Sequence, residues 1–180
     1  MDLEIKAATI EDAELLVDIY NKAFYEDYVK YGECPGYGRS VSDMEKSIKE
    51  SSKYIAYVGS AAVGAISVLK KDDGLYYLGA LCVIPEYQRQ GIGHKLLEFI
   101  KDKYKDWKKI ELVTPADKEK NVNFYTKKCG FIIDGEEMDG SVKLYHFSLT
   151  NERKLGKERK NENKRSNNRT AERFYSGNER

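Results

Sequence analysis

Two glycines and the polar residues around them form the stretch of this chain whose residue types best suit chemistry. Residues 83–97 read Val-Ile-Pro-Glu-Tyr-Gln-Arg-Gln-Gly-Ile-Gly-His-Lys-Leu-Leu. Gly91 and Gly93 carry no Cβ, so the backbone from Gln88 to His94 can turn its N–H groups into one concavity and let an anion approach closely. The helix expected next adds unpaired first-turn donors and the positive end of its dipole. The stretch therefore predicts a pyrophosphate-binding site.

Two better-known phosphate loops do not fit this stretch. The dinucleotide fingerprint needs a third small residue where this chain has Leu96, and it opens the first strand-to-helix turn of its domain. A P-loop needs Gly-Lys followed by Ser or Thr, whereas His94 follows Gly93 here. What remains is Gln-x-x-Gly-x-Gly preceded by Val-x-Pro, and the alternative is an ordinary strand-to-helix turn.

The hydrophobic pattern predicts the elements that must hold this turn in place. Thr9 and Asp12 have the spacing of a capping box, Ser42 can cap a second helix, and the loop between these helices is expected over residues 26–39. The expected helices cover residues 9–25, 42–51, 92–104 and 117–128. The expected strands cover residues 3–5, 54–58, 62–69, 75–84, 110–114, 131–134 and 142–149.

A second motif lies near the end of this run of elements, where residues 123–131 read Asn-Phe-Tyr-Thr-Lys-Lys-Cys-Gly-Phe. Together with the Gln-x-x-Gly-x-Gly turn and the order of elements, it resembles the GNAT superfamily of N-acetyltransferases over about residues 3–149. The resemblance implies the α/β (α+β) acyl-CoA N-acyltransferase fold, with a mixed, mostly antiparallel sheet of about seven strands flanked by about four helices. It also implies acetyl-CoA as co-substrate.

The same resemblance implies roles for individual residues. Tyr125 would protonate the leaving thiolate, and a phenol of pKa near 10 suits a thiol of pKa about 8.5. The alternative is that Tyr125 is only a core aromatic. The strand before the turn would part from its neighbour to admit the pantetheine chain, and the backbone N–H near Val83 would stabilise the oxyanion of the thioester carbonyl. The implied contacts to the co-substrate are Val83, Gln88, Arg89, Gln90, Gly91, Ile92, Gly93, His94 and Asn121.

The chain departs from the family pattern at two places. Where members often carry an Asn that touches the co-substrate, this chain has Lys118, which would pair with a CoA phosphate or face solvent; Asn121, one turn later, is the possible substitute. Where many members carry a carboxylate on the strand before the turn, this chain has Gly79 and Ala80. No general base is therefore assigned. The candidates are Glu111, His146 and a water held by a tyrosine.

The segment after the first expected helix predicts the chemistry of the acceptor. It is both aromatic and acidic, and such a surface suits a cationic amine through ring faces and carboxylates. The alternative is a solvated loop that is merely rich in Tyr and Glu. The residues in question are Tyr20, Tyr25, Glu26, Asp27, Tyr28, Tyr31, Glu33 and Tyr37. We expect acceptor contacts from Tyr25, Glu26, Tyr28 and Tyr31.

Composition predicts one domain, residues 1–150, and a tail, residues 151–180. The tail holds ten Lys/Arg and five Asp/Glu, whereas the preceding part holds 21 and 25, so the body is acidic and the tail basic. Few large apolar residues occur in the tail, which predicts disorder rather than nucleic-acid binding. Three widely spaced cysteines and two histidines predict no disulfide and no metal site. The chain lacks an apolar run of membrane-spanning length and an N-terminal signal pattern, so we expect a cytoplasmic monomer or homodimer.

The resemblance, together with these patterns, predicts an N-acetyltransferase that moves the acetyl group of acetyl-CoA directly to a primary amine. Antibiotics, polyamines and protein amines are all primary amines, and the expected acceptor is a small cationic amine. A protein N-terminal or lysine acetyltransferase is an alternative, favoured by the basic tail. A non-catalytic acyl-CoA-binding module is another alternative, favoured by the missing carboxylate at residues 79–80.

Overall fold

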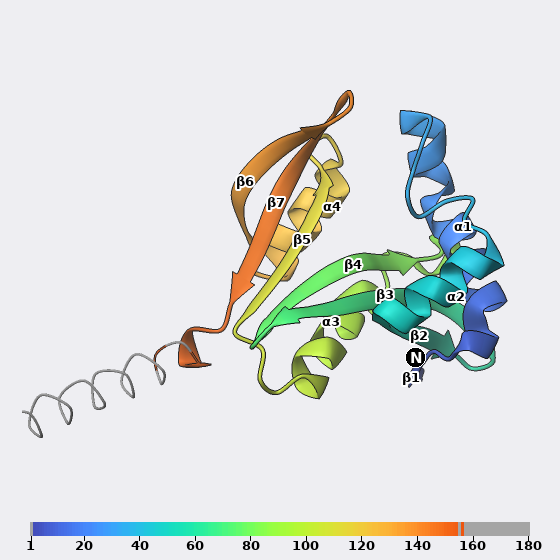
Figure 1. Ribbon diagram of the computed structural model, residues 1–180, viewed down its shortest axis with the longest axis horizontal. Coiled ribbons are helices and arrows are strands. Elements are labelled where there is room, and N and C mark those ends of the chain that lie inside the picture. Colours follow the sequence, from blue (N-terminus) through green and yellow to red (C-terminus); the bar gives the residue numbers. More distant parts are fainter. Residues whose placement is uncertain (1, 155, 157–180) are drawn as a thin grey trace, which may run out of the picture.

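One mixed sheet, covered on both faces by helices, makes up the computed structural model, which describes residues 2–154 and 156 (Figure 1). The predicted disorder of the tail concerns residues that lie almost wholly outside this range. The strands are β1 (Leu3–Ala7), β2 (Ser52–Val58), β3 (Ala61–Asp72), β4 (Leu75–Val83), β5 (Lys109–Pro115), β6 (Ile132–Asp139) and β7 (Val142–Thr150). The helices are α1 (Ala13–Tyr31), α2 (Val41–Glu50), α3 (Ile92–Lys103) and α4 (Glu119–Asn123), and short helical turns are η1 (Ile10–Asp12), η2 (Pro85–Tyr87) and the π-helical η3 (Phe124–Lys128).

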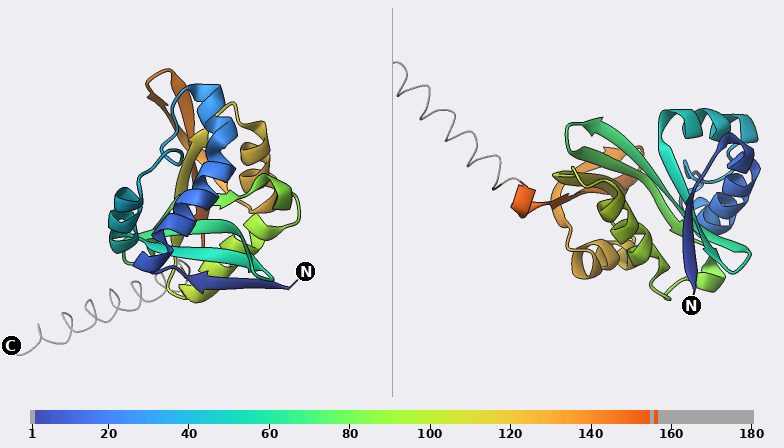
Figure 2. Two further views of the ribbon diagram at one scale, coloured as in Figure 1. Left: turned by 90° about the vertical axis from the view of Figure 1, so that its right-hand side faces the viewer. Right: turned by 90° about the horizontal axis from the view of Figure 1, so that it is seen from below.

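The strand order in the sheet is β1-β2-β3-β4-β5-β7-β6. Every neighbouring pair is antiparallel except β4 and β5, which are parallel. Helices α1 and α2 cover one face, and α3 and α4 cover the other (Figure 2). The predicted fold class, a mostly antiparallel sheet of seven strands between helices, is confirmed. None of the helices in residues 2–154 carries an apolar stretch long enough to cross a bilayer.

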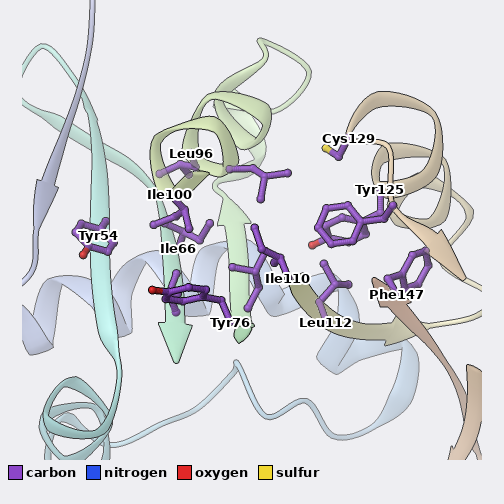
Figure 3. Packing of buried hydrophobic residues seen from close by; sticks show 14 of the residues in the cluster. Tyr54, Ile66, Tyr76, Leu96, Ile100, Ile110, Leu112, Tyr125, Cys129 and Phe147 are labelled. Carbon is purple, nitrogen blue, oxygen red and sulfur yellow. The ribbon is translucent and has the colours of Figure 1, made fainter. Parts of the chain in front are cut away.

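Two apolar clusters hold the helices onto the sheet. On the α3 side, Leu96, Leu97 and Ile100 are fully buried against the strands, with Tyr76 and Ile110 in the same cluster (Figure 3). Burying a side chain of this size stabilises the fold by about 1.5–3 kcal/mol. The other cluster joins α1 and α2 to the opposite face of the sheet, chiefly through residues at helical spacing on α1.

The capping box predicted at the start of the first helix is confirmed, and it opens the turn η1, which runs directly into α1; the predicted end of that helix is wrong. Thr9 and Asp12 form the capping box, in which the Thr9 N–H donates to Asp12 Oδ2 at 2.8 Å. The helix then continues to Tyr31 rather than Tyr25, so residues 26–31 are helical and not loop. The reason is that the first helix-ending signal is Gly32, which takes a left-handed conformation with φ +77°.

The starts of two other helices also differ from prediction. Ser40, not Ser42, caps α2, because the Ser40 hydroxyl accepts the Asp43 N–H at 3.0 Å. The helix expected over residues 117–128 begins only at Glu119 and widens into a π-helical turn from Phe124. A π-turn inserts one residue into the helical repeat, and such turns are frequent at functional sites.

The predicted boundary near residue 150 can be tested by truncation. Ending the chain at Lys154 is expected to leave the melting temperature unchanged, because the later residues carry too little apolar surface to join a core. Ending it at Thr150 is expected to lower stability, because the Asn151 N–H donates to the Lys108 carbonyl at 2.8 Å and its side-chain amide donates to the Trp107 carbonyl at 3.3 Å. Each bond contributes about 0.5–1.5 kcal/mol. Thermal melts of the two truncated chains measure the difference, and a clear drop for the longer one would place the tail in the fold.

Candidate active site

Strands β4 and β5 separate after three residues of pairing. Their parallel ladder joins Leu75–Tyr77 to Lys109–Glu111 and then ends. Beyond it, β4 continues against β3 as far as Val83, and β5 continues against β7 as far as Pro115. Figure 1 shows the two strands diverging from their shared end. The sheet therefore opens into a wedge whose two sides are strand edges.

A bulge begins this separation. Ser67 of β3 pairs with Ala80 and the next residue pairs with Leu78, so Gly79 is the extra residue on β4. Further along, the Ile84 N–H donates to the Val63 carbonyl of β3 at 2.9 Å. Because the backbone groups of an antiparallel strand point to alternate sides, the Val83 N–H points into the wedge. Its direction suits the oxyanion role that the resemblance implies for it.

The turn from Gln88 to His94 follows this strand edge. Gly91 caps α3 in a left-handed conformation with φ +80°, where a Cβ would meet open space. The first bond of the helical ladder runs from Lys95 N–H to the Gly91 carbonyl at 3.0 Å. The N–H groups of Ile92, Gly93 and His94 therefore precede that ladder and stay available to an anion.

Side chains of the turn brace its shape. The Gln88 amide donates to the Val83 carbonyl at 3.0 Å, and the Gln90 amide donates to the Glu86 carbonyl at 3.2 Å. Arg89 has a φ of +61°, a left-handed conformation that costs a non-glycine residue about 1–2 kcal/mol. Gln88 thus connects the turn to the end of β4, and Gln90 connects it to the residues just before the turn.

A cavity of about 690 Å³ joins the wedge to the turn. Its walls come from α1, the end of β4, the turn with the start of α3, and α4 with η3. The predicted co-substrate residues that line it are Val83, Gln88, Arg89, Gly91, Ile92, Gly93, His94 and Asn121. Gln90, which braces the turn, does not line it. The remaining lining residues are Ala23, Phe24, Asp27, Leu81, Cys82, Tyr87, Lys118, Lys120, Phe124, Tyr125 and Lys128.

Tyr125 enters this cavity from η3. Its ring packs against Phe124, Phe131 and Phe147 at centroid distances of 5.1–5.6 Å, and it is 8% exposed (Figure 3). Burial raises the pKa of the Tyr125 phenol above its ordinary value. The side chain therefore stays protonated at neutral pH and keeps a proton to donate into the cavity.

Residues 14–131 match the Acetyltransferase (GNAT) family. The chain belongs to this family. The predicted resemblance is thus confirmed for the body of the chain, which holds both the turn and Tyr125.

Two Bacillus subtilis proteins are similar to this GNAT chain in sequence. The uncharacterized protein YrkN is 32% identical over 107 residues, which are 57% of this chain and 58% of YrkN. The UPF0157 protein YqkA is 30% identical over 131 residues, which are 72% of this chain and 36% of YqkA. The chain thus spans little more than half of one relative's length and about a third of the other's.

Solved structures of GNAT proteins share the fold. The PaiA N-acetyltransferase of Thermoplasma acidophilum, in complex with coenzyme A, superposes with a TM-score of 0.69 at 22% identity, covering 84% of this chain and all of that one. A spermidine N-acetyltransferase SpeG chimera from Vibrio cholerae and hSSAT gives 0.68 at 15%, covering 86% and 99%. The ribosomal-protein-S18-alanine N-acetyltransferase of Escherichia coli gives 0.66 at 16%, covering 83% and 94%.

The acceptor residues predicted from the GNAT sequence lie apart from the cavity lining. Tyr25, Glu26 and Tyr28 are exposed on α1, where Tyr28 stacks on Tyr37 with ring centroids 4.5 Å apart. The Tyr31 hydroxyl donates to Asp117 at 2.6 Å. Their assignment to the acceptor stays a prediction.

Three residues of α1 do line the cavity, namely Ala23, Phe24 and Asp27. None of the three was predicted as an acceptor contact, and Asp27 was assigned to a loop because the predicted helix ended at Tyr25. The signal was present, since Tyr20, Ala23, Phe24 and Asp27 follow the three- and four-residue spacing of one helical face. Asp27 binds Lys118 from the other side of the cavity, with 2.6 Å between Oδ2 and Nζ. No local pattern around Asp27 or Lys118 predicts their contact.

The candidate bases form other contacts. Glu111 lies 2.7 Å from the ammonium of Lys109, and His146 Nε2 lies 3.3 Å from Glu137 Oε1. Neither lines the cavity.

Cys82 does line the cavity, but burial raises the pKa of its thiol to about 12, so the thiol stays protonated and is a poor nucleophile. Within residues 2–154, no three His, Cys, Asp or Glu side chains gather as metal ligands would.

Proposed function

We propose that this protein transfers the acetyl group of acetyl-CoA to a primary amine. The observation that carries the proposal is that one cavity joins the donor-rich turn at Gly91, the inward N–H of Val83 and the protonated phenol of Tyr125. These three groups are the anion-binding site, the oxyanion donor and the proton donor that the transfer needs.

The residues of the cavity fit coenzyme A. The turn offers the first-turn N–H groups of α3 and leaves open space beside Gly91, where phosphate oxygens can approach the backbone. Arg89, Lys120 and Lys128 line the same cavity and supply positive charge. The diverging strands give the pantetheine chain a place to lie along β4.

The acetyl transfer itself asks little covalent chemistry of the protein. The Val83 N–H donates to the thioester carbonyl oxygen and stabilises the charge that develops there as the amine attacks. The amine attacks the carbonyl carbon in its neutral form, after its ammonium proton has passed to solvent. As the carbon–nitrogen bond forms and the carbon–sulfur bond breaks, the Tyr125 phenol donates its proton to the departing sulfur, and the proton that the new amide nitrogen loses returns to the phenolate through solvent. Direct transfer needs no acyl-enzyme, which agrees with the protonated state of Cys82.

We further propose that the acceptor is a cationic amine. An alkylamine of pKa about 10.4 arrives protonated at neutral pH, and Asp27 is the sole carboxylate among the described residues that line the cavity. The two named neighbours that act on spermidine and on a protein's alanine represent the small-amine and protein alternatives.

A panel of acceptors tests the proposal. Purified protein with acetyl-CoA should release free thiol when given spermidine, cadaverine or a lysine peptide, and release should be faster than without an amine. A lysine peptide that outperforms every small amine would indicate a protein acetyltransferase. Binding of acetyl-CoA without thiol release from any acceptor would favour the non-catalytic module, which the absence of a carboxylate at Gly79 and Ala80 allows.

A further inference from the structure

The ion pair between Asp27 and Lys118 lies in the wall of the cavity. Lys118 Nζ donates to Asp27 Oδ2 at 2.6 Å, across 91 residues of sequence. The two side chains are only 21% and 17% exposed. The pair Lys22–Asp18 on the same helix α1 is 2.7 Å long, but both of its side chains are 54% exposed.

The two partners come from opposite walls. Asp27 projects from α1, with Ala23 and Phe24 on the same helical face, and Lys118 immediately precedes α4. The last residues of β4 line the same cavity, including Val83, whose N–H points into the wedge. An ammonium group bound to Asp27 would therefore share one cavity with the proposed oxyanion donor.

The side chain of Lys118 carries the same charged group as a cationic amine acceptor. It is a butylammonium group, and the structure holds that group at hydrogen-bond distance from a partly buried carboxylate. From this we infer that Asp27 is the binding subsite for the acceptor's ammonium group, and that Lys118 occupies the subsite until an acceptor displaces it. The inference rests on the proposed function and names the residue that would recognise its second substrate.

Two further contacts between α1 and the segment before α4 do not involve Lys118, so Lys118 can leave Asp27 without detaching the end of α1. Asp117 accepts the Tyr31 hydroxyl at 2.6 Å and pairs with Lys30 Nζ at 2.7 Å, so the end of α1 stays attached to the segment before α4. Cys34 lies near the pair and feels the charges of Asp27 and Lys118. Burial, reinforced by the charge of Asp27, raises the pKa of its thiol, so Cys34 stays neutral and does not compete for either partner.

An internal competitor has a distinctive effect on affinity. While Lys118 occupies Asp27, only a fraction of the molecules can receive an acceptor, and the apparent affinity falls by that fraction. Removing the lysine charge should therefore tighten acceptor binding, whereas removing the carboxylate should weaken it. A purely structural ion pair predicts no such opposition, because both substitutions break the same contact.

The experiment titrates n-butylammonium, the probe that matches the lysine side chain, into the full chain and follows backbone amide shifts by NMR. Asp27→Asn is expected to weaken binding by about tenfold or more. Lys118→Met is expected to strengthen it by about three- to tenfold. Asp18→Asn and Lys22→Met make the same substitutions in the exposed pair of α1 and should leave the dissociation constant unchanged.

The initial rate with the best amine of the panel provides a second readout. KM for the amine should rise in Asp27→Asn and fall in Lys118→Met, while the melting shift caused by acetyl-CoA stays the same in both. Weaker n-butylammonium binding by Lys118→Met, undetectable binding by that variant, or unchanged binding by Asp27→Asn would overturn the inference. Failure of the wild-type protein to bind acetyl-CoA or release thiol would instead overturn the proposed function, because the n-butylammonium titration needs neither.

Discussion

Replacing Gly91 by Asp is expected to abolish the stabilisation that acetyl-CoA gives the wild-type protein. At about one hundred times its Kd, a ligand that binds only the folded state adds roughly 2.7 kcal/mol to the free energy of unfolding. The new carboxylate would stand at the start of α3, where the phosphates are expected to bind the first-turn N–H groups. Its negative charge and its bulk would both oppose them.

The structure provides a matched control for this variant. A side chain at Gly91 meets no other atom within 4 Å, so the fold should tolerate one, at the cost of a left-handed conformation that Asn and Asp adopt more readily than other residues. Gly91→Asn adds the same bulk without the charge and should keep part of the acetyl-CoA effect. Thermal melts with and without acetyl-CoA measure all three proteins. A wild-type melting shift in Gly91→Asp would show that the turn does not bind the phosphates.

Replacing Tyr125 by Phe is expected to lower kcat by about 10²-fold or more, because only the proton donor is lost. The ring keeps its contacts with Phe124, Phe131 and Phe147, so the fold and the affinity for acetyl-CoA should change little. Steady-state rates with the best acceptor of the panel, together with acetyl-CoA melts, separate the two effects. Wild-type turnover would mean that Tyr125 serves the core alone.

The pH dependence gives an independent check on Tyr125. Burial raises the pKa of its phenol above the ordinary value of about 10, so the donor form persists at every pH below that. The wild-type rate should therefore show no decline from phenol ionisation as the pH rises through about 10, where an ordinary phenol would lose its proton. Tyr104→Phe is the matched control for Tyr125→Phe. It also removes a tyrosine hydroxyl, but that hydroxyl lies 2.8 Å from the Tyr54 hydroxyl, and Tyr104 does not line the cavity.

Local patterns in the sequence predicted the parts of the site that local chemistry specifies. The turn at Gly91 and the aromatic at Tyr125 lie in contiguous motifs, and the structure brings them to one cavity. The parting of β4 from β5 followed only from the resemblance, and the bulge at Gly79 was not predicted, because a strand's own residues do not reveal where its neighbour stops pairing.

Contacts between distant segments could not be predicted in this way. The Asp27–Lys118 pair depends on α1 continuing past Tyr25, and the aromatic and acidic stretch after that residue was predicted as loop, although Asp27 keeps the helical spacing of the residues before it. Once α1 is extended, Asp27 turns toward the cavity while Tyr25 and Tyr28 turn outward. Because the predicted helix ended too early, the predicted acceptor contacts were residues that do not line the cavity, and Asp27, which does line it, was not among them.

The parting of β4 and β5 also affects how well the protein resists proteases when acetyl-CoA is not bound. The inner edge of each strand carries backbone groups that no neighbouring strand satisfies, as an outermost strand of a sheet does. Amides on those edges, such as that of Val83, should exchange with solvent deuterium faster than amides paired along β3. A co-substrate that lies between the two edges would cover these unpaired backbone groups. The concentration of acetyl-CoA would then govern resistance to proteases as well as rate.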